Sequence, residues 1–308
     1  MLQEYSIVNG RITQGHDGVI PIDLYIAPDD AEKAKLIGEF GIDEHTLASS
    51  VDPDEPPRME FEPNHTAIII KYPKNYSADD NFLFKVKSMG IFVFSNRVVL
   101  VVSDNVQMFT GKIALNVSTV QDILLRVLLQ AVRHFESHLR VINMCSEEIE
   151  SEINEAIENR SLLNMFTLEK GLVYYVNALS GNGRVIERVK VNAAKLGLTG
   201  ENLELLDDLA IENNQSLDQA QVYSQVLSGL MDARASIVSN NLNVMMKNMN
   251  AIVISVAVPT FFTGVGGMSE FTGAVGDAHK FWAYPLFMLT MAFLGYATFL
   301  VIKKFERH

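Results

Sequence analysis

Two long uncharged stretches dominate the last fifth of the chain. The first covers residues 248–268 and the second covers residues 281–302, and neither contains a charged side chain. A helix needs roughly 20 apolar residues to cross the hydrocarbon core of a bilayer. The pattern therefore predicts two transmembrane helices, joined by a segment, 269–280, that is too short to form a domain.

The first hundred residues show a different pattern, in which short apolar runs alternate with turn-forming residues. Asp29 and Asp30 follow Pro28 and give the start signal of a helix over 29–40. Apolar or alternating runs predict strands over 20–27, 66–72, 82–89, 90–95 and 97–102. We expect an α+β domain with a mixed sheet.

Beyond Ser118 the apolar residues recur at helical spacing, and proline is absent until Pro259. Residues 120–158 form one amphipathic pattern, with Ile and Leu on one face and six Glu residues on the other. A last helix is predicted from about Glu201 through the first apolar stretch to about Gly264. Some sixty residues at about 1.5 Å each give a rod of about 90 Å. Such a rod is longer than a small domain needs, and it suits a stalk that carries a membrane helix into an oligomer.

The distribution of basic residues predicts the orientation in the membrane. Short flanks rich in Lys and Arg stay in the cytoplasm. The flanks outside the two spans carry Lys247, Lys303, Lys304 and Arg307, whereas the connecting loop carries Glu270 and Asp277 against Lys280. Both termini are therefore expected in the cytoplasm. The first residues lack a basic region followed by an apolar core, so we expect the first span to act as the insertion signal.

Composition narrows the classes of function. The formal net charge is −12 and the pI is about 5.0, which argues against nucleic acid as a partner. An acidic domain close to a membrane could gather divalent cations, but acidic helices can also serve solubility alone. Cys145 is the single cysteine, so neither a disulfide within the chain nor a multi-Cys zinc site can form.

The first span carries polar residues that a lipid-facing helix would not need. Asn250, Ala257 and Gly264 recur at helical spacing with Asn243 and Met246 just before them. Amides at membrane depth need partners or water. They could lie in the wet headgroup region, or they could line a water-filled pore. The glycines at 264, 266 and 267 allow close backbone approach and leave carbonyl groups free to face an ion.

Motifs of enzymes are weak in this chain. His134 and His138 lie four residues apart, but the glutamate between them is not in the order of a His-Glu-x-x-His zinc site, so a packed or solvated helix face is favoured. The segment 181–184 (Gly-Asn-Gly-Arg) lacks the Lys-Ser/Thr of a phosphate loop, and it predicts a break or kink in a helix. We find no Ser/His/Asp arrangement and expect no enzyme.

Four short segments together resemble one family. The first span ends in Gly266-Gly267-Met268-Ser269, and it follows a segment, 228–247, that ends in Asn-Val-Met-Met-Lys. The second span starts with Trp282-Ala283-Tyr284-Pro285 and is followed by Lys303-Lys304. These segments resemble the CorA-type divalent cation channels, whose first span ends in Tyr-Gly-Met-Asn. Gly266 stands in place of that Tyr, and Ser269 stands in place of that Asn.

The resemblance implies an architecture and a set of site residues. It implies a homopentameric funnel in the inner or plasma membrane, with a turn at 159–162 between two antiparallel acidic helices. Asn243, Met246, Asn250, Ala257 and Gly264 would then line the pore. Gly267, Met268, Ser269 and Glu270 would form the selectivity mouth. Asp208, with Asp79 and Asp80 in a turn, would bind regulatory cations between subunits.

The expected division of the chain follows from these patterns. It comprises a cytoplasmic α/β domain (1–117), antiparallel acidic helices (118–200), a stalk (201–247), a pore-lining span (248–268), an outer loop (269–280), a second span (281–302) and a basic tail (303–308). The favoured function is uptake of Mg²⁺, also of Co²⁺ and Ni²⁺, with cytoplasmic divalent ions closing the pore. A zinc transporter of the same fold and a non-conducting scaffold protein anchored in the membrane remain alternatives.

Overall fold

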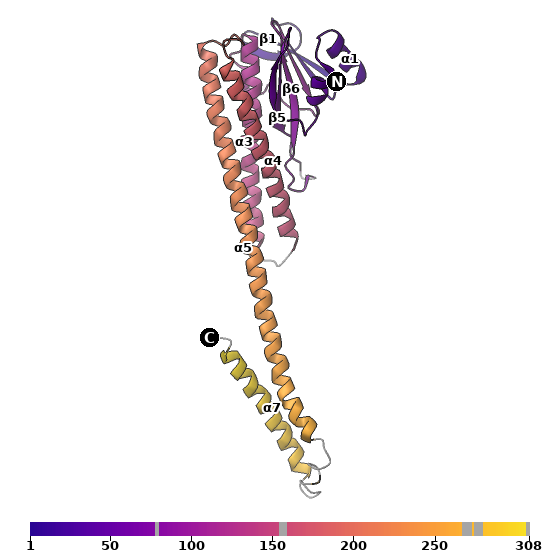
Figure 1. Cartoon of the computed structure of the whole chain (residues 1–308), viewed down its shortest axis with the longest axis vertical. Coiled ribbons are helices and arrows are strands. Elements are labelled where there is room, and N and C mark those ends of the chain that lie inside the picture. Colours follow the sequence, from indigo (N-terminus) through magenta and orange to yellow (C-terminus); the bar gives the residue numbers. More distant parts are fainter. Residues whose placement is uncertain (78–79, 154–158, 267–272, 274–279, 306–308) are drawn as a thin grey trace. The chain divides into compact units, whose positions relative to one another are not determined.

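The computed structural model describes residues 1–77, 80–153, 159–266, 273 and 280–305. These residues form two compact units, Met1–Met231 and Asp232–His308. The first unit holds a sheet and the helices packed on it, and the second holds two apolar helices (Figure 1). The helix α5 (Gly200–Gly266) belongs to both units.

The sheet has seven strands in the order β2-β1-β3-β7-β6-β5-β4. Only β3 and β7 pair in parallel among these strands, and all other neighbours are antiparallel, so the predicted mixed sheet is confirmed. Their bounds are β1 Leu2–Val8, β2 Arg11–Gln14, β3 Pro21–Ile26, β4 Arg58–Phe61, β5 Thr66–Pro73, β6 Val86–Val93 and β7 Val98–Val102.

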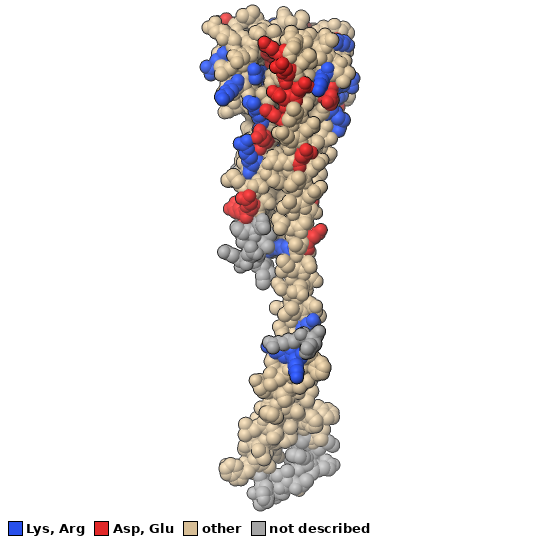
Figure 2. Space-filling view, turned by 90° about the vertical axis from the view of Figure 1, so that its left-hand side faces the viewer, with Lys and Arg blue, Asp and Glu red and all other residues tan. Residues whose placement is uncertain are grey.

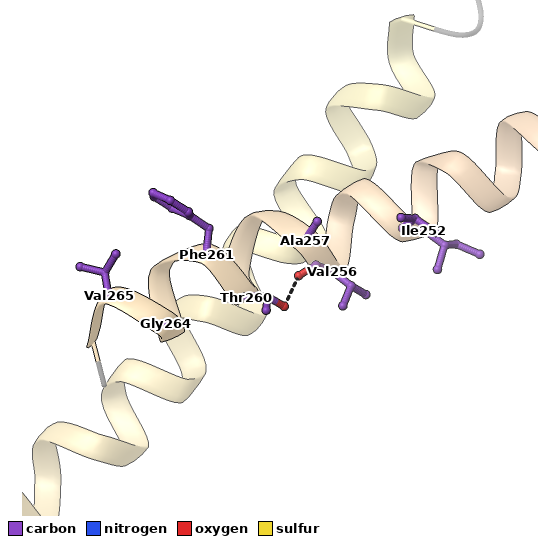
Figure 3. Close-up of a pocket in the computed structure, with 8 residues that line it drawn as sticks. Ile252, Val256, Ala257, Thr260, Phe261, Gly264 and Val265 are labelled. Carbon is purple, nitrogen blue, oxygen red and sulfur yellow. Dashed lines mark hydrogen bonds between the residues drawn. The ribbon is translucent and has the colours of Figure 1, made fainter. Parts of the chain in front are cut away.

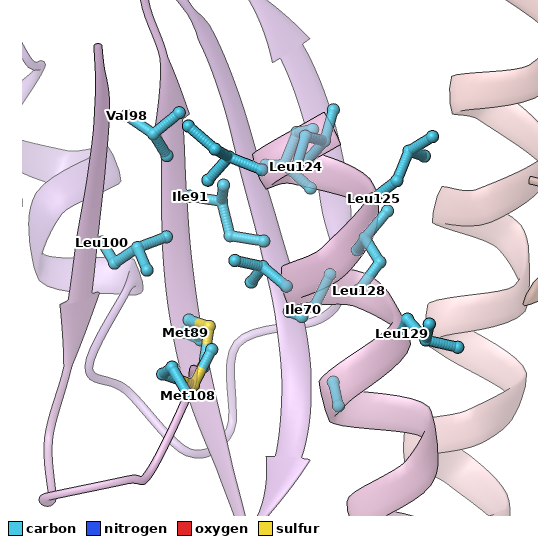
Figure 4. Packing of buried hydrophobic residues seen from close by; sticks show 14 of the residues in the cluster. Ile70, Met89, Ile91, Val98, Leu100, Met108, Leu124, Leu125, Leu128 and Leu129 are labelled. Atoms are coloured by element: carbon cyan, nitrogen blue, oxygen red, sulfur yellow. The ribbon is translucent and has the colours of Figure 1, made fainter. Parts of the chain in front are cut away.

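The central strands are buried on both faces. In β7, Val98, Leu100 and Val102 contribute to the apolar cluster on one face, and Val99 and Val101 contribute to the cluster on the other. Side chains alternate between the faces of a strand, so a continuous apolar run indicates a sheet covered on both sides. Figure 4 shows the first cluster, where Leu124 and Leu128 of a long helix lie toward Ile70 and Ile91, and Leu125 and Leu129 lie on the side of that helix nearer the neighbouring helices.

Different helices cover the two faces. The short helices α1 (Asp30–Gly38) and α2 (Glu44–Ser49) cover one face, where Leu36 and Leu47 are buried. Asp29 caps α1 and accepts a hydrogen bond from the Glu32 amide, as the start signal predicts. The other face is covered by α3 (Val120–Ile153) and α4 (Asn159–Val191), with the 3₁₀ turn η2 (Gly111–Ala114) beside them.

A two-residue turn joins β1 and β2, two strands that the sequence reading missed. Val8 pairs with Arg11, and the turn residues Asn9 and Gly10 have φ values of 51° and 72°. This is the backbone that the twist of a hairpin favours, and Asn-Gly is its strongest sequence signal. The signal for these two strands was therefore present in the chain.

Three sequence predictions are wrong in detail. The two strands expected over 82–89 and 90–95 are one strand, β6, because Gly90 lies within it and not at a turn. A side chain at Gly90 would overlap the Ser50 hydroxyl, which explains a glycine inside a strand. The turn expected over 159–162 lies within α4, and the helix break expected at 181–184 is absent because α4 continues through it.

The second unit contains the end of α5 and the helix α7 (Lys280–Phe305). Both helices are long and apolar enough to cross a membrane. The two pack against each other at Gly295, where a Cβ would lie 3.0 Å from the Ser255 carbonyl oxygen and 3.2 Å from Pro259 Cγ. The predicted pair of apolar helices is therefore present, with a glycine at a close contact between them.

Candidate pore helix and acidic sites

The packed face of α5 in the second unit is marked by its buried residues. Ala251 and Ser255 are buried, and Pro259 is half-buried against α7. Pro259 has no backbone N–H, so the carbonyl of Ser255 lacks its usual partner within the helix. That carbonyl lies against Gly295, whose missing side chain leaves room for it.

The hydroxyl groups of this segment are bonded within α5. Ser255 Oγ donates to the Ala251 carbonyl at 2.6 Å, and Thr260 Oγ1 donates to the Val256 carbonyl at 2.7 Å. Thr263 Oγ1 donates to the Thr260 carbonyl at 2.9 Å. Each hydroxyl thus uses its one proton on the helix, and its oxygen lone pairs stay available as acceptors.

The residues predicted to line a pore lie on another face of the same helix. Asn243, Asn250, Ala257 and Gly264 are seven residues apart, and all four are exposed, as is Met246. At about 100° per residue they form one stripe, roughly 140° around the helix from Ser255. The stripe therefore faces away from α7 and has no partner among the described residues of one chain.

A shallow hollow of about 870 Å³ adjoins this stripe. Figure 3 shows Ile252, Val256, Ala257, Thr260, Phe261, Gly264 and Val265 around it, on the side of α5 away from the ribbon of α7. Thr260 is the polar residue of this wall, and the sequence reading missed it. Its signal was its spacing, because Thr260 lies three residues after Ala257 and four before Gly264, so a helix brings it next to both.

The predicted selectivity mouth falls on residues that the structure does not describe. Gly267, Met268, Ser269 and Glu270 lie outside the described residues, and so does Asp79. The described part of the first span ends at Gly266.

Asp80 is engaged within its own turn. Its carboxylate accepts hydrogen bonds from the Ser77 amide at 3.0 Å and the Ser77 hydroxyl at 3.1 Å, and the Lys74 ammonium lies 3.3 Å away. These groups, the Ser77 amide first, lower the pKa of Asp80. The carboxylate is therefore ionised at neutral pH, and a cation bound there would compete with Lys74.

Asp208 lies on the exposed side of the first turns of α5, together with Glu201, Glu204 and Asp207. Asp207 forms an ion pair with Lys190 of α4 at 2.6 Å. Figure 2 shows Asp and Glu side chains gathered in a column over this region. In the described residues of one chain, no group of three His, Cys, Asp or Glu side chains is arranged to hold a metal.

The histidine pair is part of a packed layer. His138 is 8% exposed, and its Nδ1 lies 2.7 Å from the Tyr175 hydroxyl. The ring of His134 meets that of His138 edge to face, with centroids 4.6 Å apart. Burial, and then the neighbouring His134, lower the pKa of His138 to about 4. The favoured interpretation of a packed helix face fits this arrangement.

Comparison with known proteins adds a family to this geometry. The model of a family described as CorA-like Mg²⁺ transporter protein matches residues 22–304. The Cobalt/magnesium transport protein CorA of Methanocaldococcus jannaschii is 26% identical over 284 residues, covering 89% of this chain and 87% of that protein. The protein of the same name from Thermotoga maritima is 23% identical over 282 residues, covering 87% of this chain and 78% of that protein.

A solved structure shares the fold over the whole chain. The complete structure of the CorA magnesium transporter from Methanocaldococcus jannaschii matches with a TM-score of 0.76 and 20% sequence identity. The match covers 100% of this chain and 98% of that one. At 20% identity this similarity establishes the fold of the chain, and it does not identify the transported ion.

Proposed function

The chain belongs to the family of CorA-like Mg²⁺ transporter proteins. From this family we propose that several copies of the chain form a membrane pore for divalent cations, with Mg²⁺ as the main ion. Its family makes it a membrane transporter of divalent cations and not an enzyme. The observation that carries the pore proposal is the exposed stripe of Asn243, Asn250, Ala257 and Gly264 on α5.

The chemistry of the stripe suits a hydrated ion. Mg²⁺ gives up its water reluctantly and is often bound through its hydration shell. The amides of Asn243 and Asn250 can donate to and accept from water, and the four residues of the stripe are themselves uncharged. Carbonyl groups near Gly264 would continue this lining toward the segment 267–270, which we propose as the selectivity mouth through Gly267, Met268, Ser269 and Glu270.

The driving force and the closed state follow from general physics. A divalent ion gains roughly 4.6 kcal/mol on crossing about 100 mV toward the negative side, so no nucleotide is needed. Met246 and Met249 are exposed in one chain, and rings of these side chains would close the pore by excluding water. We propose that Mg²⁺ bound between copies near Asp208 favours this closed state, with five copies as the resemblance implies.

A flux measurement tests the proposal directly. The purified full chain, placed in liposomes with a negative interior potential, should take up Mg²⁺, Co²⁺ and Ni²⁺ as reported by an ion-sensitive dye. Uptake of Zn²⁺ in preference to Mg²⁺ would indicate a zinc transporter of the same fold. Absence of uptake of all four ions would indicate a scaffold protein, and recovery of flux in Ser269→Asn would assign the loss to the mouth.

Cysteine accessibility tests which face lines the pore. Because Cys145 is the single cysteine, Cys145→Ala gives a background for new thiols. Ala257→Cys in this background should lose flux when a charged thiol reagent is added from the water. Phe262→Cys, five residues and about 140° further round α5 toward α7, is the matched control and should keep it. Equal inhibition of the two variants would refute the assignment of the stripe.

A further inference from the structure

A second cavity lies in the unit Met1–Met231, far from the apolar helices in sequence. It has a volume of about 620 Å³ and lies between the Pro-rich segment after α2, the segment 83–87 leading into β6, and α4. Small-molecule sites have volumes of roughly 300–1,000 Å³, so its size suits one small molecule. None of its lining residues belongs to the proposed pore.

The cavity is lined mainly by basic side chains, although the whole protein is acidic. Four basic side chains line it, from Lys71, Lys85, Lys87 and Arg184, against the single acid Asp54. Lys87 Nζ is 3.6 Å from the carboxylate of Asp104, which lies outside the cavity. Because this ion pair neutralises Lys87, the cations that can bind a ligand are Lys71, Lys85 and Arg184. Such a concentration of positive charge on a chain of net charge −12 favours an anionic ligand.

Lys71 is the best positioned of these cations. It is 7% exposed, and its Nζ donates to the Pro53 carbonyl at 2.5 Å and to the Ser88 hydroxyl at 2.8 Å. An ammonium has three donors, so one remains for a ligand beyond these two bonds. Burial lowers the pKa of Lys71, and an anion beside it would offset that cost.

The remaining wall of the cavity is apolar and includes one aromatic ring. Val86, Ala178 and three prolines at 53, 56 and 57 line it, and Tyr174 is 41% exposed at its edge. Flat rings stack on aromatic and apolar surfaces of this kind. The exposed amide of Asn177 adds a donor and an acceptor between the two regions.

We propose that this cavity binds a nucleoside di- or triphosphate, with the phosphates at Lys71, Lys85 and Arg184 and the base against Tyr174 and the prolines. An inorganic phosphate would use only the basic end, and a neutral nucleoside only the apolar end. Because one cavity of this size has both a basic end and an apolar end, it favours a ligand that carries both phosphates and a flat base.

Calorimetric titration of the purified full chain with ATP in metal-free buffer tests this inference. ATP should bind more tightly than inorganic triphosphate and adenosine. The double variant Lys85→Glu, Arg184→Glu should weaken ATP binding about tenfold or more, since charge-assisted hydrogen bonds to phosphate are lost. The matched control is Lys112→Glu, an exposed residue outside the cavity, which should leave the affinity unchanged.

A further variant separates the two ends of the cavity. Tyr174→Ser should weaken binding of ATP and leave binding of triphosphate unchanged. Equal affinity for ATP and triphosphate would overturn the base-binding part of the inference. Failure of ATP to bind to folded protein, or equal weakening by Lys112→Glu, would overturn the whole site. Ion flux is measured separately, so neither result depends on the proposed pore.

Discussion

His138 shows how one polar side chain is accommodated in an apolar layer. It lies between α3 and α4 with Phe84 edge-on to its ring and the Tyr175 hydroxyl at Nδ1. Tyr175 is itself buried, which raises the pKa of its hydroxyl well above 10. The Tyr175 hydroxyl can donate to Nδ1 or accept from it, so the contact does not require one charge state, and it is burial that disfavours the imidazolium.

This arrangement predicts a dependence of stability on pH. The pKa of His138 is about 4 in the folded chain against 6.5 for a free imidazole, so the unfolded state binds more protons between these values. The stabilisation is complete above pH 6.5 and is lost as the pH falls toward 4, by up to about 3 kcal/mol. Thermal unfolding in detergent at pH 7.5 and 5.0 should show a smaller loss in His138→Gln than in the unchanged protein.

The control for this measurement is a histidine on the surface. His45 is exposed at the start of α2, so His45→Gln should keep the full pH dependence. If His138→Gln and the unchanged protein lost the same stability between the two pH values, the buried imidazole would not be its source. Glutamine retains an amide that can bond the Tyr175 hydroxyl, which separates titration from simple loss of a partner.

At the scale of elements, α4 is fixed to the sheet by side chains that the sequence reading interpreted as a helix break. Pairing of β5 with β4 ends at Ile69. Beyond it, the Asn182 amide accepts from the Lys71 N–H and donates to the Lys71 carbonyl, both at 2.8 Å. One side chain of a helix thus takes the place of the missing strand neighbour, and Gly181 beside it lets α4 approach Pro57.

The close approach at Gly181 predicts that substitution by alanine will change the stability differently at Gly181 and at Gly229. A Cβ at Gly181 would lie 2.6 Å from Pro57 Cγ, and Gly181→Ala should destabilise the unit by about 1–3 kcal/mol through overpacking. At Gly229 of α5 nothing lies within 4 Å of such a Cβ. Gly229→Ala should be neutral or stabilising by up to about 1 kcal/mol, because alanine favours the helix. Melting temperatures in detergent check both, and equal shifts would contradict the packing argument.

These details explain which elements sequence reasoning could reach. Helix α5 and the strand β5 were predicted because their patterns are long and regular over 201–264 and 66–72. Gly90 and Gly181 were misread because a glycine that breaks an element and a glycine that admits a neighbour look alike in sequence. The neighbours, Ser50 and Pro57, come from segments far away along the chain.

At the scale of the whole molecule, the stripe on α5 exposes polar side chains that have no hydrogen-bond partner among the described residues of one chain. Asn243 and Asn250 are exposed on a helix that is apolar enough to cross a membrane. Asn250 lies within the predicted span, where an amide facing hydrocarbon is costly and needs water or a polar partner. The positions of these residues were predictable from their spacing, but their partners were not, because the described residues of one chain supply none.

Cross-linking can test the contact between copies at one level of α5. In the Cys145→Ala background, Asn243→Cys places a thiol on the stripe, and Asn248→Cys places one about 140° around the helix. If the stripes of neighbouring copies face a common axis, mild oxidation should link Asn243→Cys into covalent dimers and leave Asn248→Cys largely unlinked. Native mass measurement should then give a multiple of 34.3 kDa. Linkage through Asn248→Cys alone would require the pore to be built from another face of α5. A monomeric mass would refute a pore built from several copies.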